Sequence, residues 1–355
     1  MLILQVSDNG GHAAKIEREL VEQGMDWQLA WMEPAAALSS DMVPDVLVCS
    51  ARVGSNSGLM LLGQLRARYP EAVRILLMDA DHDQDVMQAM EVSQRVLPEP
   101  LETLPLIEAV ESVMELRALL DNPALEKAIG RIGSLPAAPR QYLALTRLLR
   151  DPDVSAARVA EVVAQDPGVA AKVLRMTNSA YYSAGRETVD LRTAVTRLGQ
   201  NVLRHLVLAS EAFSADASSA EANAMRDRAL RISRLAGQLL AGPSAELAAT
   251  AGLLAEVGLL LPPLRSDDLN GATISHSAAG AYLLGLWGLP SPIVEAVAFH
   301  QCPARIRGFW VTGAVHVAAA LINGSEVDED YLRSVGQLDQ LPRWRALADA
   351  QAEAT

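Results

Sequence analysis

Short apolar runs alternate with amphipathic segments over the first 120 residues of the chain. Five runs have the length and composition of strands, and the segments between them repeat their apolar residues every three to four positions. This pattern predicts strands at 2–6, 27–31, 46–50, 73–78 and 95–98, and helices at 13–23, 59–69, 83–91 and 104–119. Strands that alternate with helices are typical of a doubly wound α/β fold, whose site lies at the carboxyl ends of the parallel strands.

Beyond residue 135 the alternation stops, and long helical periodicities follow that are separated by Gly and Pro. The pattern predicts an all-α second domain. Within it, Asp166-Pro167 is a helix start, because Asp caps free backbone N–H groups and Pro fits the first helical turn. Asn122-Pro123 ends the helix at 104–119. We expect domains at 1–120 and 135–330, a linker at 121–134, and a C-terminal tail at 331–355 whose end frays.

Length and charge narrow the classes of function. A chain of 355 residues fits two domains. Its net charge of -13 leaves no excess of cations to neutralise phosphates, so we expect no nucleic-acid partner. The arginines that recur between residues 197 and 234 are typical of a solvated helix face on an acidic protein. They are Arg197, Arg204, Arg226, Arg228, Arg231 and Arg234.

The chain has two cysteines, Cys49 and Cys302, which make neither a disulfide framework nor a metal-ligand set. The N-terminus lacks the basic and apolar regions of a signal peptide. No uncharged apolar stretch reaches the ~20 residues of a membrane span. We therefore expect a cytoplasmic protein without a membrane partner.

Three segments resemble the first, third and fifth strands of a response-regulator receiver domain. They are ILQVSDN at 3–9, PDVLVCSARVGSNSG at 44–58 and RVLPEP at 95–100. In that family an acidic pair after the first strand binds Mg²⁺, and an Asp that ends the third strand takes the phosphoryl group. A Thr or Ser ends the fourth strand, and a Lys follows the fifth. The resemblance implies a flavodoxin-like sheet of five parallel strands.

The positions that match these receiver residues are Ser7 with Asp8, Ser50, Asp79 and Glu99. Ser50 has no carboxylate to form an acyl phosphate, and Glu99 puts a negative charge where a cation would meet the phosphoryl oxygens. Asp79 replaces a hydroxyl donor with an anion. A lone Asp8 at a strand end is more often a surface or capping group than a metal ligand. We therefore expect a pseudo-receiver domain.

Several segments of the second half resemble an HDOD domain. They are SLPAAP at 134–139, AQDPGVAAKVLRMTNSAYY at 164–182, TAVTRLG at 193–199, HSAAGAYLLGLWGLP at 276–290 and IVEAVAFHQCP at 293–303. HDOD domains are relatives of HD-type phosphohydrolases, in which a His-Asp pair and further histidines coordinate metals that activate water. The resemblance implies a helical domain related to these metal-dependent enzymes.

The segment that matches the His-Asp pair is GLLAEVG at 252–258, where Ala255 stands for the histidine and Glu256 for the aspartate. Arg228 occupies or adjoins the place of an upstream histidine, and a guanidinium repels a metal cation. His276 and His300 remain at suggestive positions. We expect them to fix local structure by hydrogen bonds, or to line with Arg228 a polar pocket that accepts a small anion.

Together these features predict a non-catalytic bacterial signalling protein, related to two-component systems, that acts through protein–protein contacts without a cofactor or metal. Expected partners are a kinase, a nucleotide-signalling enzyme or another regulator, and the helix at 104–120 is a candidate homodimer surface. Two alternatives stay open. One is a metal-dependent phosphohydrolase that uses His276, His300, Glu256 and Asp227. The other is a sensor of a nucleotide or another small ligand.

Overall fold

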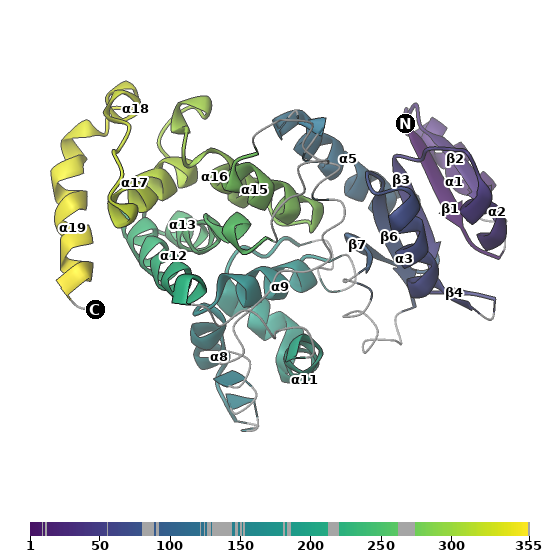
Figure 1. The fold of residues 1–355 in the computed structure, drawn as a ribbon, viewed down its shortest axis with the longest axis horizontal. Coiled ribbons are helices and arrows are strands. Elements are labelled where there is room, and N and C mark those ends of the chain that lie inside the picture. Colours follow the sequence, from purple (N-terminus) through teal and green to yellow (C-terminus); the bar gives the residue numbers. More distant parts are fainter. Residues whose placement is uncertain are drawn as a thin grey trace.

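The computed structural model has two parts, a sheet flanked by helices near the N-terminus and a larger helical part that follows (Figure 1). It describes residues 1–353 except 9, 11–12, 55, 80–88, 90–91, 121, 124, 126–128, 130–143, 146–147, 150, 152, 180–181, 183–185, 212–219 and 262–273. Side chains are also left undescribed at 201, 204–211, 220–223 and 352–353. Most of the predicted helix at 83–91 and of the predicted linker at 121–134 lies outside the described residues.

The sheet of the first part is parallel throughout and has the order β2-β1-β3-β6-β7. Its strands are β1 (Leu2–Val6), β2 (Gln28–Met32), β3 (Val46–Ser50), β6 (Val73–Met78) and β7 (Arg95–Pro98). The five predicted strands are confirmed, with a shift of one residue in β2. Every residue of β3 and β6 is buried, which explains why these strands read as unbroken apolar runs.

The helices around the sheet are α1 (Ala13–Glu22), α2 (Pro34–Ser39), α3 (Gly58–Arg68) and α5 (Thr103–Leu120). α1 contacts α5, and α2 contacts α3, as expected for helices on the two faces of a doubly wound sheet. Sequence patterns did not predict α2 or the hairpin of β4 (Arg52–Val53) and β5 (Asn56–Ser57). Both are too short to show a periodicity. α5 buries Leu106, Val110 and Val113, so its apolar face serves core packing.

The second part is helical, as predicted. Its elements are α8 (Ala156–Val163), α9 (Pro167–Thr177), α11 (Leu191–Glu211), α12 (Ala220–Leu239), α13 (Pro243–Leu254), η2 (Val257–Leu260), α15 (His276–Leu286), α16 (Ser291–Phe299), η3 (Pro303–Arg305), α17 (Val311–Asn323), α18 (Glu329–Ser334), η4 (Leu338–Gln340) and α19 (Leu341–Glu353). In the part of the chain that is described, no helix is both long enough and apolar enough to cross a membrane.

A buried ion pair joins α9 to α12. Asp166 caps α9 as predicted, because its Oδ1 accepts hydrogen bonds from the backbone N–H groups of Gly168 and Val169 at 2.8 and 3.1 Å. Its Oδ2 accepts a hydrogen bond from Arg226 Nε at 2.6 Å, and the two side chains are 0% and 1% exposed. The expectation that Arg226 lies on a solvated face is therefore wrong. The spacing of arginines along one helix does not reveal which of them meets a distant carboxylate.

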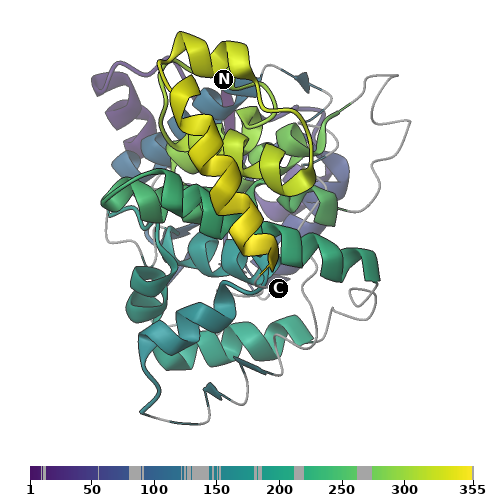
Figure 2. The same cartoon turned by 90° about the vertical axis from the view of Figure 1, so that its left-hand side faces the viewer.

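Residues 331–355, expected as a tail, contain the end of α18, all of η4 and all of α19. Figure 2 shows α19 lying across the outer side of the helical part. Trp344 of α19 stacks on Phe309, with 5.1 Å between the ring centroids. Trp344 also joins Leu341, Tyr331 and Leu332 in a small second core. The alanine-rich composition concealed these few apolar anchors, which hold the helix in place.

His316 of α17 connects this C-terminal region to His300, the residue that directly follows α16. It is buried, its Nδ1–H donates to the carbonyl of His300 at 2.7 Å, and its Nε2 accepts from the backbone N–H of Asp328 at 2.9 Å. Since both ring nitrogens are used in these roles, the ring is neutral. Burial lowers the pKa of His316, although the hydrogen bond to His300 and the charge of Asp328 oppose this shift.

Acidification should destabilise the fold through His316. Its folded pKa is lowered, so the stabilisation is present above the ordinary pKa of about 6.5 and is lost as the pH falls below it, where the unfolded chain binds the proton more readily. We expect the free energy of unfolding, from urea denaturation, to fall by roughly 1 kcal/mol or more between about pH 7.5 and 5.5.

The matched variant is His316→Gln, whose amide donates and accepts but does not titrate. It should lose less stability over the same pH interval than the wild type. Burial lowers the pKa of His300 to about 4, so this residue contributes acid sensitivity to both proteins. An equal loss in the two proteins would contradict the assignment to His316.

The ion pair of Asp166 and Arg226 gives a second stability prediction. Arg226→Met leaves the buried carboxylate without this guanidinium and should lower the free energy of unfolding by about 3–5 kcal/mol. Asp166→Asn with Arg226→Met should cost less than the sum of the single changes, because neither charge is then left behind. Arg158→Met is the control. Arg158 pairs with Glu161 on an exposed surface, so that change should cost less than about 1 kcal/mol. Equal costs for Arg226→Met and Arg158→Met would refute the structural role of the buried pair.

Candidate functional site

At the carboxyl edge of the sheet, a hydrogen bond joins two of the predicted positions. Ser50 ends β3 and is buried, and Glu99 directly follows β7. The Ser50 hydroxyl donates to Glu99 Oε1 at 2.8 Å, and this bond passes over the end of β6, which lies between β3 and β7. Ser50 is thus a neutral donor and Glu99 an anion. The receiver resemblance implies an anionic Asp at the first position and a cationic Lys at the second.

Ser7, Asp8 and Asp79 lie at the same edge but have separate surroundings. The carbonyl and hydroxyl oxygens of Ser7 accept hydrogen bonds from Trp31 Nε1 at 3.2 and 3.1 Å. Asp8 is exposed and accepts a hydrogen bond from the backbone N–H of Gly54. Asp79 follows β6 and is also exposed. The fold thus brings Ser50 to Glu99 and gives Ser7 and Asp8 other partners.

The electrostatics of this edge are set by Glu99. Burial, and then the negative charge of Glu99, raises the pKa of the Cys49 thiol to about 12. Cys49 is therefore a neutral thiol and not a nucleophile at neutral pH. The Mg²⁺ and phosphoryl group implied by the resemblance do not fit these side chains, because Ser50 offers no carboxylate and its hydroxyl is directed at Glu99.

The second group of predicted residues surrounds the segment after α13. Ala255 caps α13 and Glu256 follows it, and both are buried. Glu256 Oε2 lies 3.5 Å from Nε of Arg228 on α12, and Glu256 Oε1 accepts a hydrogen bond from Nδ2 of Asn323 at 2.6 Å. A guanidinium and an amide thus approach the carboxylate that stands where the resemblance implies a metal-binding aspartate.

The two histidines face each other beside this carboxylate. His276 begins α15 and is half-buried, whereas His300 follows α16 and is buried, with 6.1 Å between the ring centroids. Burial lowers the pKa of His276 and lowers that of His300 to about 4, and the charge of Glu256 opposes both shifts. His300 Nδ1 bonds the carbonyl of Val297 at 2.9 Å. Both imidazoles are therefore neutral at neutral pH.

The polar cluster consists of Arg228, Glu256, His276 and His300, and it combines neutral imidazoles with a carboxylate that already faces a guanidinium. Asp227, which the phosphohydrolase alternative needs, is exposed. Within the described residues, no three or more His, Cys, Asp and Glu side chains are grouped so that they could hold a metal ion. This arrangement suits recognition by hydrogen bonds better than cation binding.

Sequence reasoning missed two residues that contact the polar cluster. Asn323 ends α17, where an Asn before Gly324 resembles an ordinary helix end. Gln301 lies 3.4 Å from His276 Nε2 through its Nε2, and its Oε1 accepts a hydrogen bond from Ser277 at 3.3 Å. The only available signals were a single polar residue closing an apolar helix and a glutamine directly after His300.

Comparison with known proteins agrees with the helical half of this description. Residues 135–269 match the family model described as the HDOD domain. A protein of Treponema pallidum (strain Nichols), described as uncharacterized, is 24% identical over 197 residues. That match covers 48% of this chain and 38% of the relative, so the chain spans well under half of the relative's length.

Two solved structures are similar to the chain at low identity. The MmoQ response regulator from Methylococcus capsulatus str. Bath is 22% identical with a TM-score of 0.47, over 60% of this chain and 98% of that one. A virulence factor from Campylobacter jejuni subsp. jejuni is 17% identical with a TM-score of 0.46, over 66% of this chain and 99% of that one.

The family match and the sheet topology account for different parts of the molecule. The matched residues begin at 135, where the second domain was predicted to begin. The parallel order β2-β1-β3-β6-β7 lies entirely before them. The chain therefore carries an HDOD domain, which follows an N-terminal five-stranded parallel sheet that fits a receiver-like domain.

Proposed function

We propose that this chain is a regulatory protein of signal transduction that acts through protein–protein contacts and catalyses no reaction at either candidate site. The presence of an HDOD domain supports a signalling-related role. The proposed partners are a kinase, a nucleotide-signalling enzyme or another regulator, with a homodimer as a further arrangement. The finer assignments rest on the chemistry of the two sites.

The observation that carries the proposal is the contact of Glu256 with Arg228. A fixed positive charge 3.5 Å from the carboxylate opposes a divalent cation at the same place. Ala255 offers only a methyl group, and Asn323 takes the other carboxylate oxygen. These features support a site that has exchanged metal chemistry for hydrogen bonding.

The Ser50–Glu99 hydrogen bond supports the same reading of the receiver-like part. A serine hydroxyl that donates to a carboxylate is not an acceptor for aspartyl phosphorylation, and the carboxylate would repel a phosphoryl group. The surfaces of this part remain available for contacts with other proteins.

Solvent exposure of the polar cluster favours one second function, the sensing of a small polar ligand. The side chain of Arg228 is 38% exposed beside the buried Glu256, and His276 is half-buried, so solvent reaches polar groups at one side of the site. A ligand that binds there would stabilise the native state. A thermal-shift screen of nucleotides against the wild type and Arg228→Met tests this function, which requires a shift in the first protein that the second lacks.

Elemental analysis separates the regulatory proposal from the phosphohydrolase alternative. We expect the purified full chain to hold far less than one Fe, Mn or Zn per molecule, because Arg228 opposes a cation beside Glu256. The matched control is the double variant His276→Gln with His300→Gln, which should show the same background. Stoichiometric metal in the wild type that is lost in the double variant would overturn the proposal.

Affinity capture of the full chain from native lysate, followed by mass spectrometry, tests the contact role. We expect a defined signalling protein to be recovered with the folded chain and absent when the chain has been unfolded by heat before capture. The double histidine variant should recover the same protein, because the proposed contacts do not require metal binding or catalysis by the two histidines. Recovery of nothing specific by a folded chain would count against the role.

A further inference from the structure

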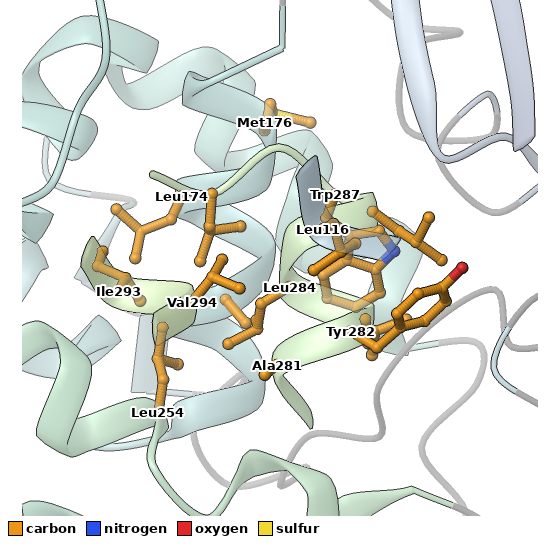
Figure 3. Close-up of a cluster of buried hydrophobic side chains, with 14 of the residues drawn as sticks. Leu116, Leu174, Met176, Leu254, Ala281, Tyr282, Leu284, Trp287, Ile293 and Val294 are labelled. Atoms are coloured by element: carbon orange, nitrogen blue, oxygen red, sulfur yellow. The ribbon is translucent and has the colours of Figure 1, made fainter. Parts of the chain in front are cut away.

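Two glycines at the end of α15 leave space that the sheet part of the molecule fills. A Cβ at Gly285 would lie 2.5 Å from a methyl carbon of Leu116, and a Cβ at Gly288 would lie 1.7 Å from Nη1 of Arg95. Leu116 belongs to α5, and Arg95 begins β7. Figure 3 draws Leu116 among the buried side chains of the helical part, near the end of α15 and Trp287. We call Arg95, Leu116, Gly285 and Gly288 the interdomain contact.

Arg95 forms the polar half of the interdomain contact. Its Nη2 donates to Ser112 Oγ at 2.5 Å and to the carbonyl of Gly285 at 3.2 Å. Burial lowers the pKa of Arg95 to about 10, while the charge of Glu187 opposes this shift. Arg95 therefore keeps its charge at neutral pH. A planar guanidinium with directed donors fixes the positions of the groups that it bonds, so Arg95 ties β7 and α5 to α15.

A second arginine makes the reverse connection, from the helical part to the sheet part. Arg175 of α9 is buried and donates to the backbone carbonyl of Ser93, two residues before β7. Its guanidinium carbon lies 4.5 Å from the centroid of the Trp287 ring, directly after α15. This cation–π contact and hydrogen bond hold the end of α15 beside the start of β7.

The other end of α15 lies against the segment that carries Glu256. A Cβ at Gly258 would lie 1.9 Å from the carbonyl oxygen of His276, and a Cβ at Gly280 would lie 2.9 Å from the backbone nitrogen of Gly258. The backbone of α15 thus packs directly on the backbone of η2 at Gly258 and Gly280, beside the Val257 side chain. The position of α15 therefore bears directly on the segment that carries Glu256, which His276 meets at the start of this helix.

We propose that the interdomain contact positions the polar cluster of the helical part. Arg95, seated against the two glycines, sets the place of α15, and α15 sets the place of His276 relative to Glu256 and His300. Arg95 is a positioning residue in this arrangement, because it acts on the polar cluster through α15 and does not contact the cluster itself.

The inference rests on the regulatory function proposed above and gives that function a route. β7 begins with Arg95 and is followed directly by Glu99, the acceptor of the Ser50 hydrogen bond. One strand therefore links the carboxyl edge of the sheet to α15. Beside Arg95 the two parts leave a cavity of about 620 Å³, lined also by Ser112, Glu187 and other residues. The two parts are therefore not closely packed over the whole of their contact.

A pair of glycine variants tests the positioning. Gly288 and Gly308 both have a φ of 80°, so an alanine costs similar backbone strain at each. Open space surrounds Gly308, whereas a Cβ at Gly288 overlaps Arg95. We expect Gly288→Ala to move the pKa of His276, followed by NMR titration of the full chain, by about 0.5 toward its ordinary value near 6.5. Gly308→Ala should leave it unchanged.

His276 reports on the polar cluster because the charge of Glu256 acts on it and because it contacts His300 and Gln301. A merely stabilising role of Gly288 would lower the unfolding temperature without moving this pKa. An unchanged His276 titration in folded Gly288→Ala overturns the proposal. So does an equal change in Gly308→Ala, because the effect would then come from strain and not from the contact.

A second set of variants covers the case in which Gly288→Ala does not fold. Gly285→Ala overlaps Leu116 and should move the His276 titration, while Gly285→Ala with Leu116→Ala removes the overlap and should bring the titration back toward the wild type. Gly63→Ala, on α3 with open space around it, is the helical control. A shift that persists in the double variant would refute the route through Leu116.

The outcomes separate this inference from the proposed function. The titration of His276 needs no partner and no activity, so a failed partner capture would remove the regulatory role and leave the positioning effect standing. If a partner is captured but the pKa of His276 does not change in Gly288→Ala, the regulatory role stands and the positioning effect is removed.

Discussion

The arrangement of the molecule depends on the missing side chains at Gly285 and Gly288. A Cβ at Gly288 would lie 1.7 Å from Nη1 of Arg95, so it would force the guanidinium away from its hydrogen bonds with Ser112 and Gly285. The glycines therefore allow Leu116 and Arg95 to lie directly against the end of α15. Only after that approach do Arg95 and Arg175 find their backbone carbonyl partners.

Buried charge then fixes what close packing permits. Arg226 meets Asp166 in the core, Arg175 lies on Trp287, and Arg95 bonds Gly285. Such groups add little net stability, but a buried charge that loses its partner is costly, so competing arrangements of the helices are disfavoured. In an acidic chain with few aromatic side chains, these arginines determine which helix faces which.

The strands were predictable because a parallel strand that is covered on both faces is apolar at nearly every position, as in 46–50 and 73–78. Short elements such as α2 were not, since six residues show no period. The positions of both candidate sites followed from the family resemblances. Their contacts did not, because Asn323 and Arg226 find their partners 67 and 60 residues away, at distances that local patterns do not encode.

The two candidate sites differ in a way that bears on how a signal would pass between them. Ser50 is buried and ends β3, its hydroxyl bonds Glu99 directly after β7, and β6 pairs with both strands. In the polar cluster, by contrast, Arg228 and His276 are reached by solvent, and α15 carries His276 at one end and the interdomain contact at the other. The sheet edge is thus suited to be a rigid frame. The polar cluster is the part that can respond to a displacement of α15. A small movement of that helix changes the distances between an imidazole, a carboxylate and a guanidinium. Each of these interactions depends steeply on distance in a partly desolvated site.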